Sequence, residues 1–289
     1  MVQVFKNRYT GITIRQMSDR MMHRYIKSLV IYSSNEKTIQ DFLRDAADDV
    51  SPLIQIGGYY DNALYICDDE SKCRSLSEQG YAVCGLIHEH NRDCRFDGIG
   101  YIIEDPAEIS LTDYEHIYRR LTGIPAQILE TDRFILRETT LDDLDRMFEI
   151  YDDDNVRSFI EPLMSREEEE EYFRNYIDRI YAFYNIGFWS VIRKSDGLMV
   201  GRAGIEYTNE DGVAELGFII DGHCRRQGYA YEITSAIIDY ARDIGDIDTV
   251  IARIREDNTA SQYLCRKLGM SPGPTLQDSL IRWSIDVGS

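Results

Sequence analysis

The stretch ELGFIIDGHCRRQGYAYE occupies residues 215–232 and leads from an apolar strand, through a loop with two arginines, into a helix. Gly228 and Ala230 carry little side-chain bulk, so a ligand can approach the backbone at the start of the helix. The free N–H groups of the first helical turn attract negative charge, and Arg225 and Arg226 stand beside them. The pattern predicts an anion site, most naturally for a phosphate or pyrophosphate.

Two common phosphate-binding motifs are absent from this loop. The G-x-x-x-x-G-K-[ST] pattern of P-loop proteins does not occur in the chain, and neither does the G-x-G-x-x-G pattern of dinucleotide-binding domains. Taken alone, the loop could equally be a glycine turn with surface arginines.

The arginine pair contrasts with a chain whose formal net charge is -19 and whose sequence pI is about 4.6. This acidity argues against general binding to nucleic acid or to anionic membranes, which require basic surfaces. An acidic surface attracts cations such as amines, basic peptides or polyamines, although solubility alone also explains it.

Length and composition predict one large or two medium domains in the 289 residues. No apolar run reaches the roughly 18 residues that suggest a membrane span, and the N-terminus has no apolar signal segment. We expect a cytoplasmic protein with reduced thiols, because none of the six cysteines forms a C-x-x-C pair. His88, His90 and Cys94 form the tightest cluster of metal-ligand types, for which a polar loop is the alternative to a metal site.

The two halves of the chain have different patterns and join near residues 123–132. Residues 1–126 are expected to form a small Rossmann-like α/β domain without catalytic function. Its strands are predicted at 63–67, 81–87 and 98–105. Helical character is predicted at 21–32, at 37–47, at 68–80 between the first two strands and at 110–121 after the third.

In the second half, residues 127–289, the first predicted strand is 133–138, and a helical segment follows at 139–153. Ser165 and Glu168 then form a predicted capping box at the start of an acidic helix. An antiparallel meander follows over residues 187–220, with Asp-Gly turns between its strands. A helix, a strand, a helix and a last strand complete the chain.

Three motifs of this half resemble the GCN5-related N-acetyltransferase (GNAT) family. Arg225-x-x-Gly228-x-Ala230 is similar to the family's acetyl-CoA loop, Q/R-x-x-G-x-G/A. AELGFII (214–220) resembles the preceding strand of the subgroup that acetylates ribosomal-protein N-termini. NTASQYLCRKLGM (258–270) resembles the next signature, with Met270 in place of its usual Phe.

The resemblance implies an α/β (α+β) fold with a mixed, mostly antiparallel sheet that is splayed open to hold acetyl-CoA as co-substrate. The pantetheine arm would lie along the backbone of residues 218–220, and the pyrophosphate would lie on backbone N–H groups of residues 226–230. The expected cofactor-binding residues are Phe218, Ile219, Ile220, Arg225, Arg226, Gln227, Gly228, Tyr229, Ala230, Asn258 and Ser261.

Glu215 and Cys265 are the candidate catalytic residues. Acetyl transfer needs a neutral amine, and Glu215, just upstream of the cofactor edge, is the predicted general base; an exposed strand glutamate is the alternative. Cys265 stands at the position where the family often has a tyrosine that protonates the departing thiolate. This departure leaves the general acid open, because buried cysteine is common and a thiolate can leave unprotonated.

Residues 64–91 resemble the last conserved segment of haloacid-dehalogenase-type phosphatases, in which Asp68 and Asp69 would match metal-side acids. The nucleophile motif of that family is absent from residues 1–62, so helix capping is the preferred reading of the two aspartates. No metal is therefore assigned.

The sequence as a whole predicts a two-domain N-acetyltransferase that moves an acetyl group to a primary amine of a peptide or small molecule. The alternatives are an acetyl-CoA sensor without turnover and a metal-dependent phosphatase in the first half. The acceptor is expected to be cationic, with no nucleic acid or membrane partner, and the protein is expected to be a monomer or homodimer.

Overall fold

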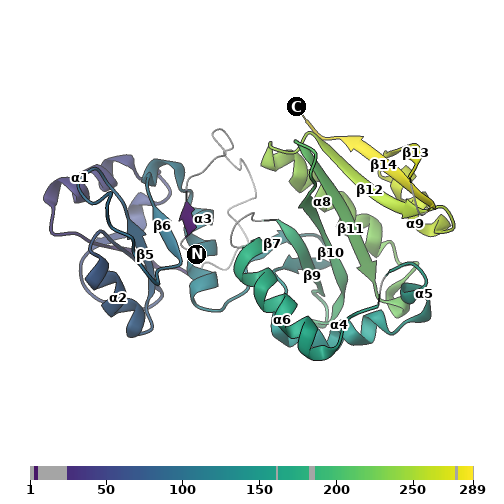
Figure 1. Cartoon of the computed structure of the whole chain (residues 1–289), viewed down its shortest axis with the longest axis horizontal. Helices are drawn as coiled ribbons and strands as arrows, with labels where there is room; N and C mark the ends of the chain where they lie inside the picture. Colours follow the sequence, from purple (N-terminus) through teal and green to yellow (C-terminus); the bar gives the residue numbers. More distant parts are fainter. Residues whose placement is uncertain (1–2, 6–24, 161, 182–185, 277–278, 289) are drawn as a thin grey trace. The chain divides into compact units, whose positions relative to one another are not determined.

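The computed structural model describes residues 3–5, 25–160, 162–181, 186–276 and 279–288. The described residues up to Ala126 belong to one compact unit, and those from Gln127 onward belong to a second (Figure 1). None of the described helices combines the length and the apolar character needed to cross a bilayer.

The N-terminal unit is built on a sheet of six parallel strands in the order β1-β6-β5-β4-β2-β3. Its central strands are short apolar runs that are buried on both faces, as is typical of parallel sheets. The strands are β1 (Gln3–Phe5), β2 (Ser28–Tyr32), β3 (Ile54–Ile56), β4 (Ala63–Cys67), β5 (Ala82–Leu86) and β6 (Tyr101–Ile103).

Three α-helices of this unit accompany the sheet: α1 (Glu36–Asp45), α2 (Glu70–Glu78) and α3 (Leu111–Leu121). The Asp69 side chain accepts a hydrogen bond from the Lys72 N–H and caps α2, as predicted. The helical prediction for 21–32 is wrong where it can be checked, because Ser28–Tyr32 is strand β2. Its branched, continuously apolar residues fit a buried strand better than a helix; residues 21–24 lie outside the described residues.

The C-terminal unit contains an eight-stranded sheet in the order β13-β14-β12-β11-β10-β9-β8-β7. Its pairs are antiparallel except for β11 with β12. The strands are β7 (Gln127–Glu130), β8 (Phe134–Arg137), β9 (Gly187–Arg193), β10 (Met199–Tyr207), β11 (Val213–Ile220), β12 (Thr249–Arg255), β13 (Ser271–Thr275) and β14 (Leu280–Asp286).

Helices cover both faces of this second sheet. On one face, α4 (Leu144–Tyr151) and α6 (Arg166–Tyr176) form a core with Met199 and Ile219. On the other, Tyr240 of α8 (Tyr229–Ile244) packs edge-on against Trp189, and α9 (Thr259–Lys267) packs on β12 and β14. A short helix, α5 (Asp154–Arg157), follows α4. The mostly antiparallel sheet agrees with the predicted fold class.

The sheet opens between β11 and β12. These strands pair only from Val213 with Thr249 to Glu215 with Ile251. Beyond that point β11 continues to Ile220, still paired with β10, and β12 continues to Arg255, still paired with β14. The strands therefore diverge after Glu215, and one edge of β11 lacks a strand partner there.

Candidate functional site

The pyrophosphate-type loop lies at the open end of β11. Gly228 (φ 76°) is the N-cap residue of α8 and provides no side-chain cap, and Arg226 also has a positive φ of 60°. Residues 225–228 are exposed. The first-turn N–H groups of α8 are therefore available to a ligand, as an anion site requires.

Arg133 is a third arginine at this loop that the sequence analysis missed. Its Nη1 donates to the Gln227 carbonyl oxygen at 2.9 Å, and its Nε pairs with Glu232 at 2.6 Å. Thr131 also donates to the Glu232 carboxylate, at 2.6 Å. The carboxylate of Glu232, in the first turn of α8, is thus neutralised, so the arginines leave the loop locally positive. Arg133 reaches the loop only because the fold places the start of β8 beside it.

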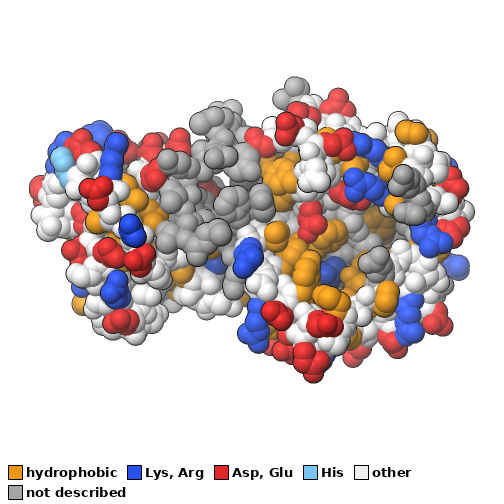
Figure 2. Space-filling model, viewed as in Figure 1, with side chains coloured by type: hydrophobic (Ala, Val, Ile, Leu, Met, Phe, Trp, Pro, Cys, Tyr) orange, Lys and Arg blue, Asp and Glu red, His pale blue; other side chains and the backbone are white. Residues whose placement is uncertain are grey.

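Two aspartates, Asp221 and Asp153, also hold this loop in position. Asp221 is buried, accepts from the His223 N–H at 2.8 Å and forms an ion pair with Arg146 of α4. Arg225 lies 3.5 Å from Asp153. Figure 2 shows basic and acidic side chains interspersed on the visible face of the unit, so a local positive mouth coexists with the overall acidity.

The other expected cofactor residues lie at the same open end. Residues 218–220 form the edge of β11 that has no β12 partner. Asn258 caps α9 by accepting from the Ser261 N–H at 3.1 Å, where the chain leaves the splayed end of β12. Tyr229 instead turns inward, because its ring is buried against Phe134 with centroids 4.7 Å apart.

Glu215 is the last residue of β11 that pairs with β12, and its side chain is partly buried. Burial raises the pKa of its carboxyl group, and nearby Glu206 raises it further, while the Arg253 guanidinium opposes both. Arg253 forms an ion pair with the Glu215 carboxylate. The group therefore keeps a basicity above that of an ordinary glutamate at the mouth of the opening.

Cys265, the second candidate catalytic residue, lies in the core of the unit. Its side chain is fully buried in a cluster with Ala252, Met270 and Trp283. Burial raises the pKa of its thiol to about 11. Ala252 follows Ile251, the cross-strand partner of Glu215, so the cluster lies on the opposite face of the sheet from Glu215. The helix thus buries this position in the core, and the role of Cys265 as a general acid stays a prediction.

The α6 side of the sheet holds a second carboxylate that the sequence analysis also missed. Glu206 of β10 is the direct cross-strand partner of Glu215. Its carboxylate accepts a hydrogen bond from the Tyr176 hydroxyl at 2.5 Å. Glu206 lines a cavity of about 490 Å³ together with Tyr172, Asn175, Tyr176, Arg179, Ile180, Ile186, Tyr207, Thr208 and Asn209. The cross-strand register could not be read from the sequence.

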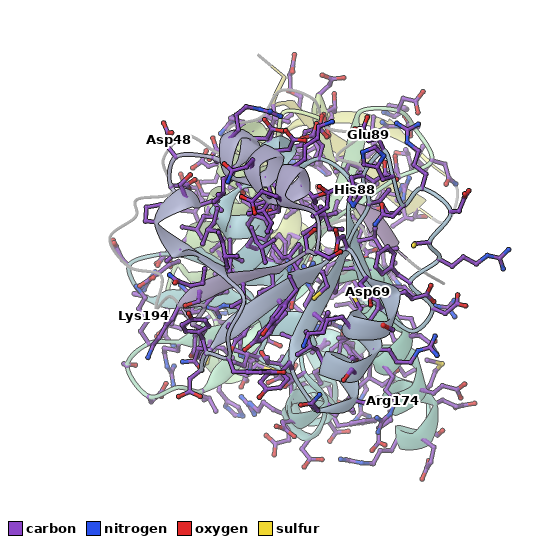
Figure 3. The ribbon with its side chains drawn as sticks, turned by 90° about the vertical axis from the view of Figure 1, so that its left-hand side faces the viewer. Asp48, Asp69, His88, Glu89, Arg174 and Lys194 are labelled. Atoms are coloured by element: carbon purple, nitrogen blue, oxygen red, sulfur yellow. The ribbon has the colours of Figure 1, made fainter. Side chains whose placement is uncertain are left out.

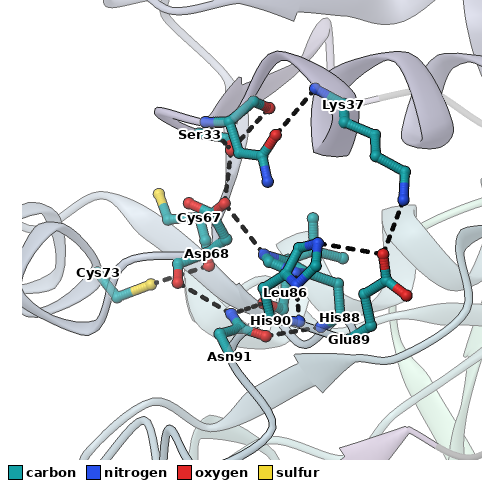
Figure 4. Close-up of polar contacts among 11 residues, drawn as sticks. Ser33, Lys37, Cys67, Asp68, Cys73, Leu86, His88, Glu89, His90 and Asn91 are labelled. Atoms are coloured by element: carbon teal, nitrogen blue, oxygen red, sulfur yellow. Dashed lines mark hydrogen bonds and ion pairs between the residues drawn. The ribbon is translucent and has the colours of Figure 1, made fainter.

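Asp68 and Asp69 of the N-terminal unit each form hydrogen bonds within that unit. Asp69 caps α2, whereas Asp68 accepts from Ser33 Oγ at 2.5 Å and lies 3.2 Å from His88 Nε2 (Figure 4). Figure 3 labels Asp69 together with His88 and Glu89, which follow β5. Among the described residues no three His, Cys, Asp or Glu side chains form a metal-binding group, and Cys94 does not join the two histidines in one.

The second unit is similar to known acetyltransferases. Residues 133–271 match the model of the acetyltransferase (GNAT) domain. The chain is similar to the uncharacterized N-acetyltransferase YjdG of Bacillus subtilis, with 29% identity over 34% of this chain and 59% of that protein. It is also similar to YoaA of the same species, with 28% identity over 49% of this chain and 81% of that protein. The match thus spans less than two thirds of YjdG.

Solved acetyltransferase structures are also similar to part of this chain. A spermidine N-acetyltransferase from Vibrio cholerae, in complex with CoA and spermine, has 18% identity and a TM-score of 0.48 over 54% of this chain and 96% of that one. The family model leaves the N-terminal unit uncovered, and the resemblance of that unit to phosphatases remains a prediction. Residues 133–271 of this chain therefore match the acetyltransferase (GNAT) domain, for which acetyl-CoA is the typical co-substrate.

Proposed function

We propose that this protein is an N-acetyltransferase that moves the acetyl group of acetyl-CoA to a primary amine, with Glu215 as general base. The observation that carries the proposal is the position of Glu215 where β11 and β12 separate, on the strand that leads to the uncapped N-terminus of α8. Its cross-strand partner Glu206 lines a cavity.

The residues around the opening suit the charges and shape of acetyl-CoA. The pyrophosphate would be held by the N–H groups of residues 226–230, with Arg225 and Arg226 as charge partners and Arg133 close behind. The pantetheine arm would run along the unpaired edge at Phe218, Ile219 and Ile220, in the manner of an added strand. Asn258 and Ser261 would border the cofactor from α9.

The proposed chemistry begins with proton transfer from the acceptor ammonium to the Glu215 carboxylate, which frees the amine lone pair. The amine nitrogen then attacks the thioester carbon, and a backbone N–H near Phe218 stabilises the developing oxyanion. As the carbon–sulfur bond breaks, the attacking nitrogen releases its second proton to solvent and becomes the amide nitrogen. CoA departs as a thiolate that takes a proton from solvent, because its intrinsic pKa is about 8.5. No side-chain acid is assigned.

The acceptor is a peptide N-terminus, a lysine or a small-molecule amine. A relative named for spermidine acts on a small amine, and another is named as a ribosomal L7/L12 α-N-protein acetyltransferase. Neither name selects among these acceptors here.

The second candidate function is an acetyl-CoA sensor without turnover, favoured by the ion pair that occupies Glu215. Titration calorimetry with acetyl-CoA, combined with a thiol-release assay over a panel of primary amines, separates the two. Binding with amine-dependent thiol release supports the enzyme, whereas tight binding without release from any amine supports the sensor.

For the N-terminal unit, residues 1–126, we propose a non-catalytic role. Asp69 is committed to the cap of α2, and Asp68 to Ser33 and His88. Magnesium-dependent hydrolysis of phosphate esters that disappears on Asp68→Asn would overturn this assignment.

A further inference from the structure

We propose that Glu206 anchors the cationic acceptor, and that the acceptor class is a primary amine with an apolar body. This inference rests on the proposed acetyl transfer and adds the residue that selects the substrate. It is carried by the pairing of Glu206 with Glu215, by the Tyr176 contact and by the adjoining cavity.

The first step is the charge balance around Glu206. Directly opposed residues of an antiparallel pair have Cβ atoms about 4.5–5.5 Å apart, and like charges there repel. Arg253 pairs with Glu215, whereas Glu206 receives only the neutral Tyr176 hydroxyl; within the described ranges no Lys or Arg forms an ion pair with it. One negative charge of the pair is therefore left without a counterion, and a bound ammonium group would supply it.

The second step is the way in which Glu206 is held. The Tyr176 hydroxyl donates to the Glu206 carboxylate and accepts from the Phe188 N–H at 2.8 Å. Tyr176 is itself buried, so its hydroxyl is fixed by packing as well as by hydrogen bonds. The hydrogen bond fixes the orientation of the Glu206 carboxylate and leaves its remaining lone pairs free to accept from a ligand. Tyr176 therefore acts as a positioning residue.

The third step is the chemistry of the cavity wall. Tyrosines 172, 176 and 207 and isoleucines 180 and 186 provide aromatic and aliphatic surface next to the carboxylate. Carboxylate and aromatic faces together favour an ammonium group attached to an apolar stem. The cation at the rim, Arg179, is exposed, so solvent screens its repulsion of such a ligand.

Glu206 and Glu215 would then have different roles, one in acceptor binding and one in catalysis. Glu206 holds the ammonium on the α6 side of the sheet, and its neighbour Glu215 takes the proton before the nitrogen attacks the thioester. Losing the anchor should weaken acceptor binding, whereas losing the base should slow the chemical step.

The binding experiment compares phenethylammonium with its uncharged analogue 2-phenylethanol by calorimetry on the full chain with CoA present. We expect the ammonium to bind at least about tenfold more tightly to the wild type, since a charge-assisted contact exceeds that factor. Glu206→Gln, which keeps the shape and the Tyr176 contact, should abolish the preference. Tyr176→Phe should reduce it, and Glu210→Gln, which alters an exposed ion pair with Arg282 outside the cavity, should not change it.

Kinetics provides the second readout. Glu206→Gln should raise the KM for phenethylamine about tenfold or more with kcat nearly unchanged, opposite to the effect of Glu215→Gln. Equal affinity of the wild type for the two probes, an unchanged preference in Glu206→Gln, or a fall in kcat alone would each overturn the anchor. Ammonium preference without any acetyl transfer would instead refute the proposed function and leave the anchor standing.

Discussion

Glu215 and Arg253 form an ion pair across the last point at which β11 and β12 are still joined. The pair has opposite consequences for the proposed reaction. Arg253 holds Glu215 ionised, as a base must be, but it also lowers the proton affinity that burial and Glu206 would otherwise give the carboxyl group.

Glu215→Gln tests the base directly. An amide of the same shape cannot accept the amine proton, so kcat should fall by about 10²–10⁴. The acetyl-CoA affinity should stay nearly unchanged, because the loop and the β11 edge are untouched. Calorimetry and steady-state kinetics on one preparation give both quantities, and full turnover in this variant would show that the base is another group.

Arg253→Met should shift the acid limb of the kcat-against-pH profile to higher pH. Glu215 must be deprotonated to act, so activity falls as the pH drops through its pKa, which already lies above the ordinary value. Removing the opposing guanidinium raises that pKa further, and the limb should shift to higher pH. The profile of kcat over pH checks this, and a limb that does not move would separate Arg253 from the titrating group.

Gly228→Glu should abolish acetyl-CoA binding. The substitution puts a side chain at φ 76° and a negative charge at the uncapped start of α8. Gly197→Glu is a matched control, since Gly197 has a similar φ of 71° in the β9–β10 turn with open space around it. If both variants bind acetyl-CoA like the wild type, the pyrophosphate lies elsewhere.

Arg133→Met should weaken acetyl-CoA binding about tenfold, because it removes a cation from the mouth and leaves Glu232 unpaired beside the anion. Arg242→Met removes an exposed arginine of the same helix, α8, and should have no effect. If calorimetry gives the two variants equal dissociation constants for acetyl-CoA, Arg133 only stabilises the loop and does not contribute to cofactor binding.

Cys265→Ala should leave kcat within about twofold of the wild type. The thiol fills a core site between α9 and the sheet, so its loss should instead lower the free energy of unfolding by about 1–2 kcal/mol. Urea unfolding measures this loss. A large fall in kcat with unchanged stability would return Cys265 to the list of catalytic candidates.

Local sequence signals were sufficient for much of the fold. The Asp-Gly turns at Gly197 and Gly212, the capping box at Ser165 and the cap at Asp69 are confirmed, because each depends on residues close in the chain. Strands β1, β3, β7 and β13 were missed. They are short or carry proline, as in SPGPT of β13, so their own residues give little strand signal and their strand state depends on pairing with a neighbouring strand.

The candidate site was predictable to a similar extent. The loop residues and Glu215 stand in recognisable order, whereas Arg133 and Glu206 enter only through strand register and the approach of β8 to α8. For Cys265, the motif position predicted a role but not the side chains that surround it, which form a buried cluster.

The measurement that tests the central claim most directly is the transfer of radiolabelled acetyl from acetyl-CoA to a primary amine. The account predicts that the wild type labels the amine with one acetyl group for each CoA thiol released, and that Gly228→Glu labels none. Acetyl-CoA binding by the wild type without a labelled amine, over a panel of peptide, lysine and small-molecule acceptors, would contradict it.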